Sequence, residues 1–143
     1  MALPKPDFEI LEHTADAGIV AHGATLAEAF AHTAEGMYAL MVDPDGVREL
    51  EARETVASGQ DLPHLLANWL LELLFLTETE GLVFHRFDVD IDDTAMQLRA
   101  TAHGEPIDRD RHALGGDIKG VTRHLLEVER EDGGYRIRVL FDM

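Results

Sequence analysis

The sequence predicts an α+β protein in which two helices pack on a largely antiparallel β-sheet or on a two-sheet sandwich. The first half of the chain combines short strand-like runs with two segments of helical period, whereas apolar residues recur with a period of two from residue 82 onward. Strands and helices segregated in this way are typical of the α+β class. A length of 143 residues suits one domain, so we expect a single domain over 1–143, with residues 1–6 flexible.

The first segment predicts two strands followed by a helix. Residues 8–12 and 17–22 are β-compatible runs separated by "HTAD", which indicates two strands that meet at a tight corner. Thr25 and Glu28 form a T-x-x-E capping box, and apolar residues then recur at spacings of three and four. We expect this helix to end before "DPDG" at 43–46.

A second helix follows a region of mixed character. Residues 47–57 alternate well enough for a partly exposed strand, although a helix also fits their periodicity. Asp61 is a suitable N-cap, Pro63 falls in the first turn, and a wide apolar face continues until Gly81, where the helix should end.

Four strands are predicted in the second half of the chain. They are "VFHRFDVDID", "AMQLRATAHG", "VTRHLLEVER" and "YRIRVLFD", which begin at residues 83, 95, 121 and 135. The short connections "DD" and "EDGG" favour hairpins, and a longer loop is expected over 105–117.

The charge and the composition exclude several classes of function. The net charge of −16 repels phosphate backbones and anionic lipids, so neither direct nucleic-acid binding nor membrane binding is expected. The chain has no cysteine, which excludes disulfides, zinc–thiolate sites and cysteine nucleophiles. The N-terminal residues do not resemble a signal peptide, and the apolar stretch at 65–76 is too short to span a bilayer. We therefore expect a soluble, cytoplasmic protein.

Common catalytic and metal-binding motifs are absent. The acidic run at 88–93 has Asp93 and Arg99 where an EF-hand loop counted from Asp88 needs glycine and glutamate, so a solvated strand face is favoured. The eight histidines show no H-E-x-x-H spacing, and the one serine, Ser58, is not in a G-x-S-x-G motif.

Two aspartates near the ends of the chain remain as candidate site residues. Asp16 follows the first strand at a corner, where a local turn role is an equally good explanation. Asp142 follows a strong strand pattern, which should hold it in the sheet. If the two were adjacent, their carboxylates and the α-carboxylate of Met143 would repel one another, by about 4 kcal/mol per pair at 4 Å and an effective dielectric near 20. Oxygen ligands of this kind favour calcium or magnesium.

Several motifs, taken in order along nearly the whole chain, resemble the archease family. They are "HTADAGIVAHGATLAEAF", "GMYALMVD", "GEPID", "DIKGVTRH" and the final "VLFDM". The resemblance implies a small α+β protein without catalytic activity of its own. It would serve as an accessory factor that promotes guanylylation and multiple turnover of the GTP-dependent RNA ligase of tRNA splicing and RNA repair.

The resemblance also implies roles for individual residues. Asp16, Asp142 and a main-chain oxygen of Met143 would hold a divalent ion, with calcium expected first and magnesium or manganese as alternatives. Lys119, together with the two aspartates, would act in ligase activation. His13 and Glu105 lie in matching motifs and are candidate supporting residues. The expected partner is the ligase, and the oligomeric state is left open.

Two other functions are kept as alternatives. A metal-dependent phosphoesterase could use His13 as a base beside an ion on Asp16 and Asp142, although two carboxylates and one histidine are few residues for an autonomous site. A general protein chaperone or modulator would bind unrelated unfolded clients.

Overall fold

The computed structural model describes residues 6–12 and 16–143. The corner at 13–15 therefore lies outside the described residues. The elements along the chain are β1 (Phe8–Glu12), β2 (Asp16–Gly23), α1 (Leu26–Met41), a 3₁₀ turn (Pro44–Gly46), β3 (Glu51–Ser58), α2 (Leu62–Glu80), β4 (Leu82–Asp92), β5 (Gln97–Pro106), β6 (Gly120–Glu131) and β7 (Gly134–Asp142).

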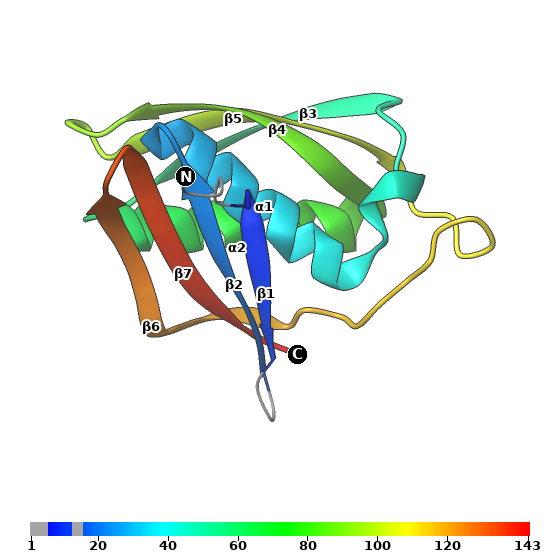
Figure 1. Cartoon of the computed structure of the whole chain (residues 1–143). Helices are drawn as coiled ribbons and strands as arrows, with labels where there is room; N and C mark the ends of the chain where they lie inside the picture. The colour runs from blue at the N-terminus through cyan, green and yellow to red at the C-terminus, as the bar shows by residue number, and fades with distance from the viewer. Residues whose placement is uncertain (1–5, 13–15) are drawn as a thin grey trace.

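The strands form two antiparallel sheets, which confirms the predicted fold class and selects the two-sheet arrangement. One sheet has four strands in the order β1-β2-β7-β6, and the other has three in the order β3-β5-β4. Helix α1 packs against β2 of the first sheet and β4 of the second, and α2 contacts β6 and β3. Figure 1 shows the three-stranded sheet across the top, with the first sheet in front of the helices. Each helix thus joins the two sheets.

Local capping signals set the ends of both helices, as predicted. The Thr25 hydroxyl accepts a hydrogen bond from the Glu28 N–H at 3.1 Å, and the Glu28 carboxylate accepts one from the Ala24 N–H at 2.9 Å. Asp61 caps α2 by accepting the N–H of His64. Gly81 ends α2 with a left-handed backbone at φ 67°, a conformation that glycine adopts without steric cost.

The strand predictions also hold, and the region with two possible structures is a strand. Residues 51–58 form β3, which pairs along its length with β5. Along β4, the aspartates 88, 90 and 92 are exposed while the residues between them are partly buried. The acidic run is therefore the solvated face of a strand, as the sequence favoured.

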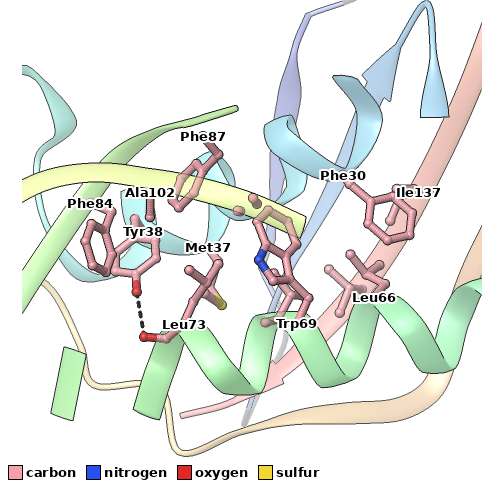
Figure 2. Close-up of a cluster of buried hydrophobic side chains, with 14 of the residues drawn as sticks. Phe30, Met37, Tyr38, Leu66, Trp69, Leu73, Phe84, Phe87, Ala102 and Ile137 are labelled. Atoms are coloured by element: carbon pink, nitrogen blue, oxygen red, sulfur yellow. Dashed lines mark hydrogen bonds between the residues drawn. The ribbon is translucent and has the colours of Figure 1, made fainter. Parts of the chain in front are cut away.

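The core lies where the helices meet both sheets (Figure 2). Trp69 of α2 stacks near Phe30 of α1, with ring centroids 6.4 Å apart, and meets Phe87 of β4 edge-on at 5.8 Å. The Tyr38 hydroxyl, drawn in Figure 2, donates to the Leu73 carbonyl at 3.0 Å and so joins the two helices inside the core. In the described part of the chain, no helix is both long and apolar enough to cross a membrane.

Candidate functional site

The structure brings Asp16 and Asp142 together across two neighbouring strands. Asp16 is the first residue of β2 and Asp142 the last of β7, and the two are direct partners in the antiparallel register. Figure 1 shows the start of β2 and the end of β7 at the same edge of the sheet. Directly opposed residues have Cβ atoms about 4.5–5.5 Å apart and point to the same face. The two carboxylates are therefore neighbours.

This face of the sheet points away from the core. The neighbouring pair is Ala17 and Phe141, and Phe141 is completely buried in the core. Because side chains alternate along a strand, Asp16 and Asp142 project from the other face. Asp142 is exposed and Asp16 is partly buried. Among the described residues, neither carboxylate has a hydrogen-bond or ion-pair partner. The corner at 13–15, where a turn role of Asp16 would be seen, lies outside the described residues, so that role stays a prediction.

Strand β6, the neighbour of β7 in this sheet, also begins beside Asp142. The backbone N–H of Lys119 donates to the Asp142 carbonyl at 2.7 Å, and the next residue, Gly120, pairs with Asp142 in the register. The Lys119 side chain is exposed. No heavy atom lies within 4 Å of where a Cβ on Gly120 would be, so the space beside Asp142 is open on this side.

Met143 is held by its side chain. It is partly buried and packs against the main core. Its terminal Cε lies 2.8 Å from the position that a Cβ on Gly116 would take, so the methionine occupies space that a side chain at 116 would need. This packing fixes the main chain directly after Asp142.

The remaining two candidates from the sequence are not joined to this cluster. His13 lies outside the described residues. Glu105 is in β5 of the other sheet and is only 2% exposed. Its carboxylate accepts hydrogen bonds from the backbone N–H and guanidinium of Arg48, from the guanidinium of Arg111 and from His112 Nε2.

The environment of Glu105 favours its charged form. Burial raises the pKa of the carboxyl group, but the hydrogen bonds from Arg111, Arg48 and His112 more than offset this and lower the pKa to about 2. His112 Nδ1 accepts the Asp108 N–H at 2.8 Å, so Nε2 carries the proton that is donated to Glu105. This arrangement anchors the 105–112 segment to the residues after the 3₁₀ turn.

The oxygens around Asp16 and Asp142 fit a hard divalent cation. The Asp142 carbonyl is already engaged by the Lys119 N–H, which leaves the two carboxylates and a main-chain oxygen of Met143 as donors. Carboxylate and carbonyl oxygens are the ligands that calcium and magnesium prefer. Like charges directly opposed in a sheet are destabilising, and a cation would relieve that repulsion.

Sequence reasoning missed the residues that shape this region. Gly120 leaves space beside Asp142, and Gly116 leaves space for the Met143 side chain. The sequence did contain a signal, because Gly116 precedes the "DIKG" motif and Gly120 ends it. The sequence analysis assigned a role only to the lysine of this motif.

Comparison with known proteins identifies the family. Residues 8–143 match the archease protein family. An archease of Methanothermobacter thermautotrophicus is 39% identical over 138 residues, which cover 95% of this chain and 98% of that protein. An archease of Pyrococcus abyssi is 37% identical over 139 residues, with the same coverage of both chains. The chain belongs to the archease family.

Solved structures agree with this assignment. The solution structure of protein 1598 of Methanobacterium thermoautotrophicum matches with a TM-score of 0.84 at 38% identity, covering 96% of this chain and 99% of that one. The crystal structure of an archease of Thermotoga maritima, described as a possible chaperone, has a TM-score of 0.64 at 21% identity over the full length of this chain and 99% of that one. The latter match supports the fold alone.

Proposed function

We propose that this chain is an accessory factor that activates a GTP-dependent RNA ligase by promoting its guanylylation and turnover in tRNA splicing and RNA repair. The observation that carries the proposal is the direct pairing of Asp16 with Asp142 at one edge of the sheet, in a chain of the archease family. The main chain of Lys119 is hydrogen-bonded to the same point.

We propose that a divalent ion, with calcium expected before magnesium or manganese, binds here. Its ligands would be the carboxylates of Asp16 and Asp142 and a main-chain oxygen of Met143. When bound, a divalent ion would offset the negative charges of the two carboxylates. Lys119 is exposed, and its ammonium group could lie against a phosphate as a point charge. The residues of this edge would thus act near the ligase's nucleotide and not as an independent catalytic centre.

The charge of the whole chain supports a protein partner in preference to RNA. A net charge of −16 repels a phosphate backbone, whereas it speeds association with the basic surface of an RNA-handling enzyme. The proposal therefore assigns RNA binding to the ligase and the acidic edge to this chain, in the same cytoplasmic compartment.

The test is covalent GMP incorporation into the cognate ligase, with this protein at substoichiometric amounts. We expect faster labelling with the wild-type chain, and a loss of at least ten-fold in the stimulated rate with Asp142→Ala or Asp16→Ala. Lys119→Ala should also reduce stimulation. The matched control is Asp93→Ala, which removes an exposed carboxylate in the β4–β5 turn.

Two results would contradict the proposal. Labelling that is unchanged by the wild-type chain would remove the accessory role, and hydrolysis of a phosphoester by the purified chain alone would favour the phosphoesterase. Calcium binding can also be measured without the ligase. The midpoint of thermal unfolding, Tm, of the purified chain is compared in the presence of calcium and in the presence of a chelator. Asp142→Ala should abolish the calcium-induced rise in Tm.

A further inference from the structure

A second group of possible ligands lies on the four-stranded sheet and α1, apart from the residues discussed above. Asp7 precedes β1, while His32 and Glu35 lie one turn apart on α1. His32 Nε2 is 3.8 Å from Asp7 Oδ2 and 4.0 Å from Glu35 Oε2. One potential ligand atom from each of the three side chains lies within 4.8 Å of the others.

Two hydrogen bonds through the backbone of His22 hold Asp7 and His32 in position. The Asp7 carbonyl accepts the His22 N–H at 2.9 Å, and the His22 carbonyl in turn accepts a hydrogen bond from His32 Nδ1 at 2.5 Å. Gly36 lets β1 approach the helix, because a Cβ there would lie 3.1 Å from the Phe8 ring. The start of β1 is therefore fixed against the part of α1 that carries the other two ligands.

The bond to His22 also decides which nitrogen of His32 is available. A carbonyl oxygen can only accept, so Nδ1 must carry a proton. In the neutral imidazole, Nε2 then has a free lone pair, and this is the atom near both carboxylates. A histidine that donates one N–H to a backbone carbonyl while its other nitrogen faces carboxylates has the arrangement common at metal sites.

The electrostatics of the cluster favour a cation. The His32 and Glu35 side chains are 22% and 28% exposed, whereas that of Asp7 is 69% exposed and can adjust. Two carboxylates thus share one imidazole, and its neutral form offsets neither of their charges.

We infer that Asp7, His32 and Glu35 form a site for a divalent transition-metal ion, with zinc as its representative. One imidazole nitrogen and two carboxylate oxygens suit zinc better than calcium, which takes oxygen ligands. Zinc bonds of about 2.1 Å in a tetrahedron place ligands about 3.4 Å apart. The two separations from His32, 3.8 Å and 4.0 Å, need to shorten by about 0.6 Å or less, and no separation in the group exceeds 4.8 Å. This site is independent of the ligase proposal.

An open pocket adjoins two of the three proposed ligands, Asp7 and His32. A depression of about 370 Å³ is lined by Asp7 and His32 together with His22, Glu28 and Glu131. Three protein ligands beside open space leave room for a water molecule or an external ligand, as is usual at zinc sites that are not closed by a fourth residue.

The experiment is calorimetric titration of the metal-free full chain with zinc chloride. It should be done in an Asp142→Asn background, so that the paired aspartates do not contribute. We expect one zinc site per chain, with the dissociation constant raised at least ten-fold by His32→Gln and about ten-fold by Glu35→Gln. In the background variant, addition of zinc should also shift the His32 imidazole nitrogen resonance assigned to Nε2.

A matched control separates this site from general attraction of zinc to histidine and carboxylate. His103 Nε2 lies 2.8 Å from Asp88 Oδ2 on the three-stranded sheet, and no metal-ligand group of three side chains in the described chain includes this pair. His103→Gln should leave zinc affinity unchanged. The inference would be overturned if the background protein, His32→Gln and Glu35→Gln bound zinc with equal affinity while circular dichroism showed that all three were folded. So would an equal loss with His103→Gln.

Discussion

At the scale of single residues, the carboxylates of this chain occupy two contrasting environments. Glu105 is buried, and Arg48, Arg111 and His112 supply its hydrogen bonds. Asp16 and Asp142 face each other with no cation from the described residues between them. The first carboxylate is thus neutralised by the protein itself, whereas the paired aspartates are suited to an ion from outside.

Glu105→Gln should lower the free energy of unfolding at pH 7 by about 2–4 kcal/mol, because it leaves two guanidinium groups without their shared carboxylate. The pKa of Glu105 is lowered from 4.5 to about 2 in the folded protein. Its contribution is therefore fully present above about pH 4.5 and is lost as the pH falls towards 2. The difference between wild type and variant should shrink over that range.

Urea unfolding at pH 7 and pH 3 measures this effect. Glu78→Gln, which changes an exposed glutamate on α2, is the control and should alter stability by less than about 0.5 kcal/mol. A cost for Glu105→Gln that is the same at both pH values would show that its charge is not what stabilises the segment.

At the scale of elements, the helices were predictable and the order of strands was not. Thr25, Asp61 and Gly81 act on neighbours within four residues, so their signals are present in any short window of sequence. The four-stranded sheet instead pairs β2 with β7, from opposite ends of the chain. Periodicity indicates that each is a strand but not which strands pair, because register depends on contacts distant in sequence.

The candidate sites show the same contrast between local signals, which the sequence contains, and contacts between distant segments, which it does not reveal. Asp16 and Asp142 could be selected from charge and resemblance, while their direct pairing required the register. The His32 cluster has no H-E-x-x-H spacing, so the motifs of the sequence did not indicate it. His32 and Glu35 are three residues apart on a helix, which was a usable signal, but Asp7 joins them only through the packing of β1 on α1.

Thr55→Val tests the polar link between α2 and the three-stranded sheet. The Thr55 hydroxyl of β3 accepts the Trp69 indole N–H at 2.9 Å and donates to the Ala100 carbonyl at 3.3 Å, and both Thr55 and Trp69 are buried. Valine keeps nearly the same shape but leaves the indole N–H without an acceptor. We expect the free energy of unfolding, measured by chemical denaturation, to fall by about 1–3 kcal/mol.

Thr55→Ser is the matched control for this link. Serine keeps the hydroxyl and removes one methyl group, so it should cost about 1 kcal/mol through lost burial alone. If serine destabilised the protein as much as valine, packing of the methyl group would account for the role of Thr55, and the hydrogen bond to Trp69 would contribute little.

At the scale of the whole molecule, acidic charge exceeds what internal ion pairs can neutralise. The 28 aspartates and glutamates outnumber the 12 lysines and arginines, so sixteen acidic groups would lack a lysine or arginine even if every such cation were paired. This excess of negative charge raises the concentration of cations near the protein surface. General screening and specific binding must therefore be measured separately.

Sodium chloride should stabilise the folded chain. Raising its concentration from about 0.01 M to about 0.15 M shortens the Debye length from about 30 Å to about 8 Å and weakens the self-repulsion of the acidic surface. We expect Tm to rise by about 2–4 °C for each kcal/mol gained, measured by calorimetry. A fall in Tm would mean that surface ion pairs such as Arg53–Glu80 contribute more than the net repulsion costs.

The double variant Asp142→Asn, His32→Gln separates this screening from the two proposed sites. It removes only one of 28 acidic groups, so its response to sodium chloride should match that of the wild type. At constant ionic strength, calcium or zinc should raise the Tm of the wild type and have little effect on the variant, because ligands that bind only the folded state stabilise it. An equal rise in both proteins would show that divalent ions act here through general screening.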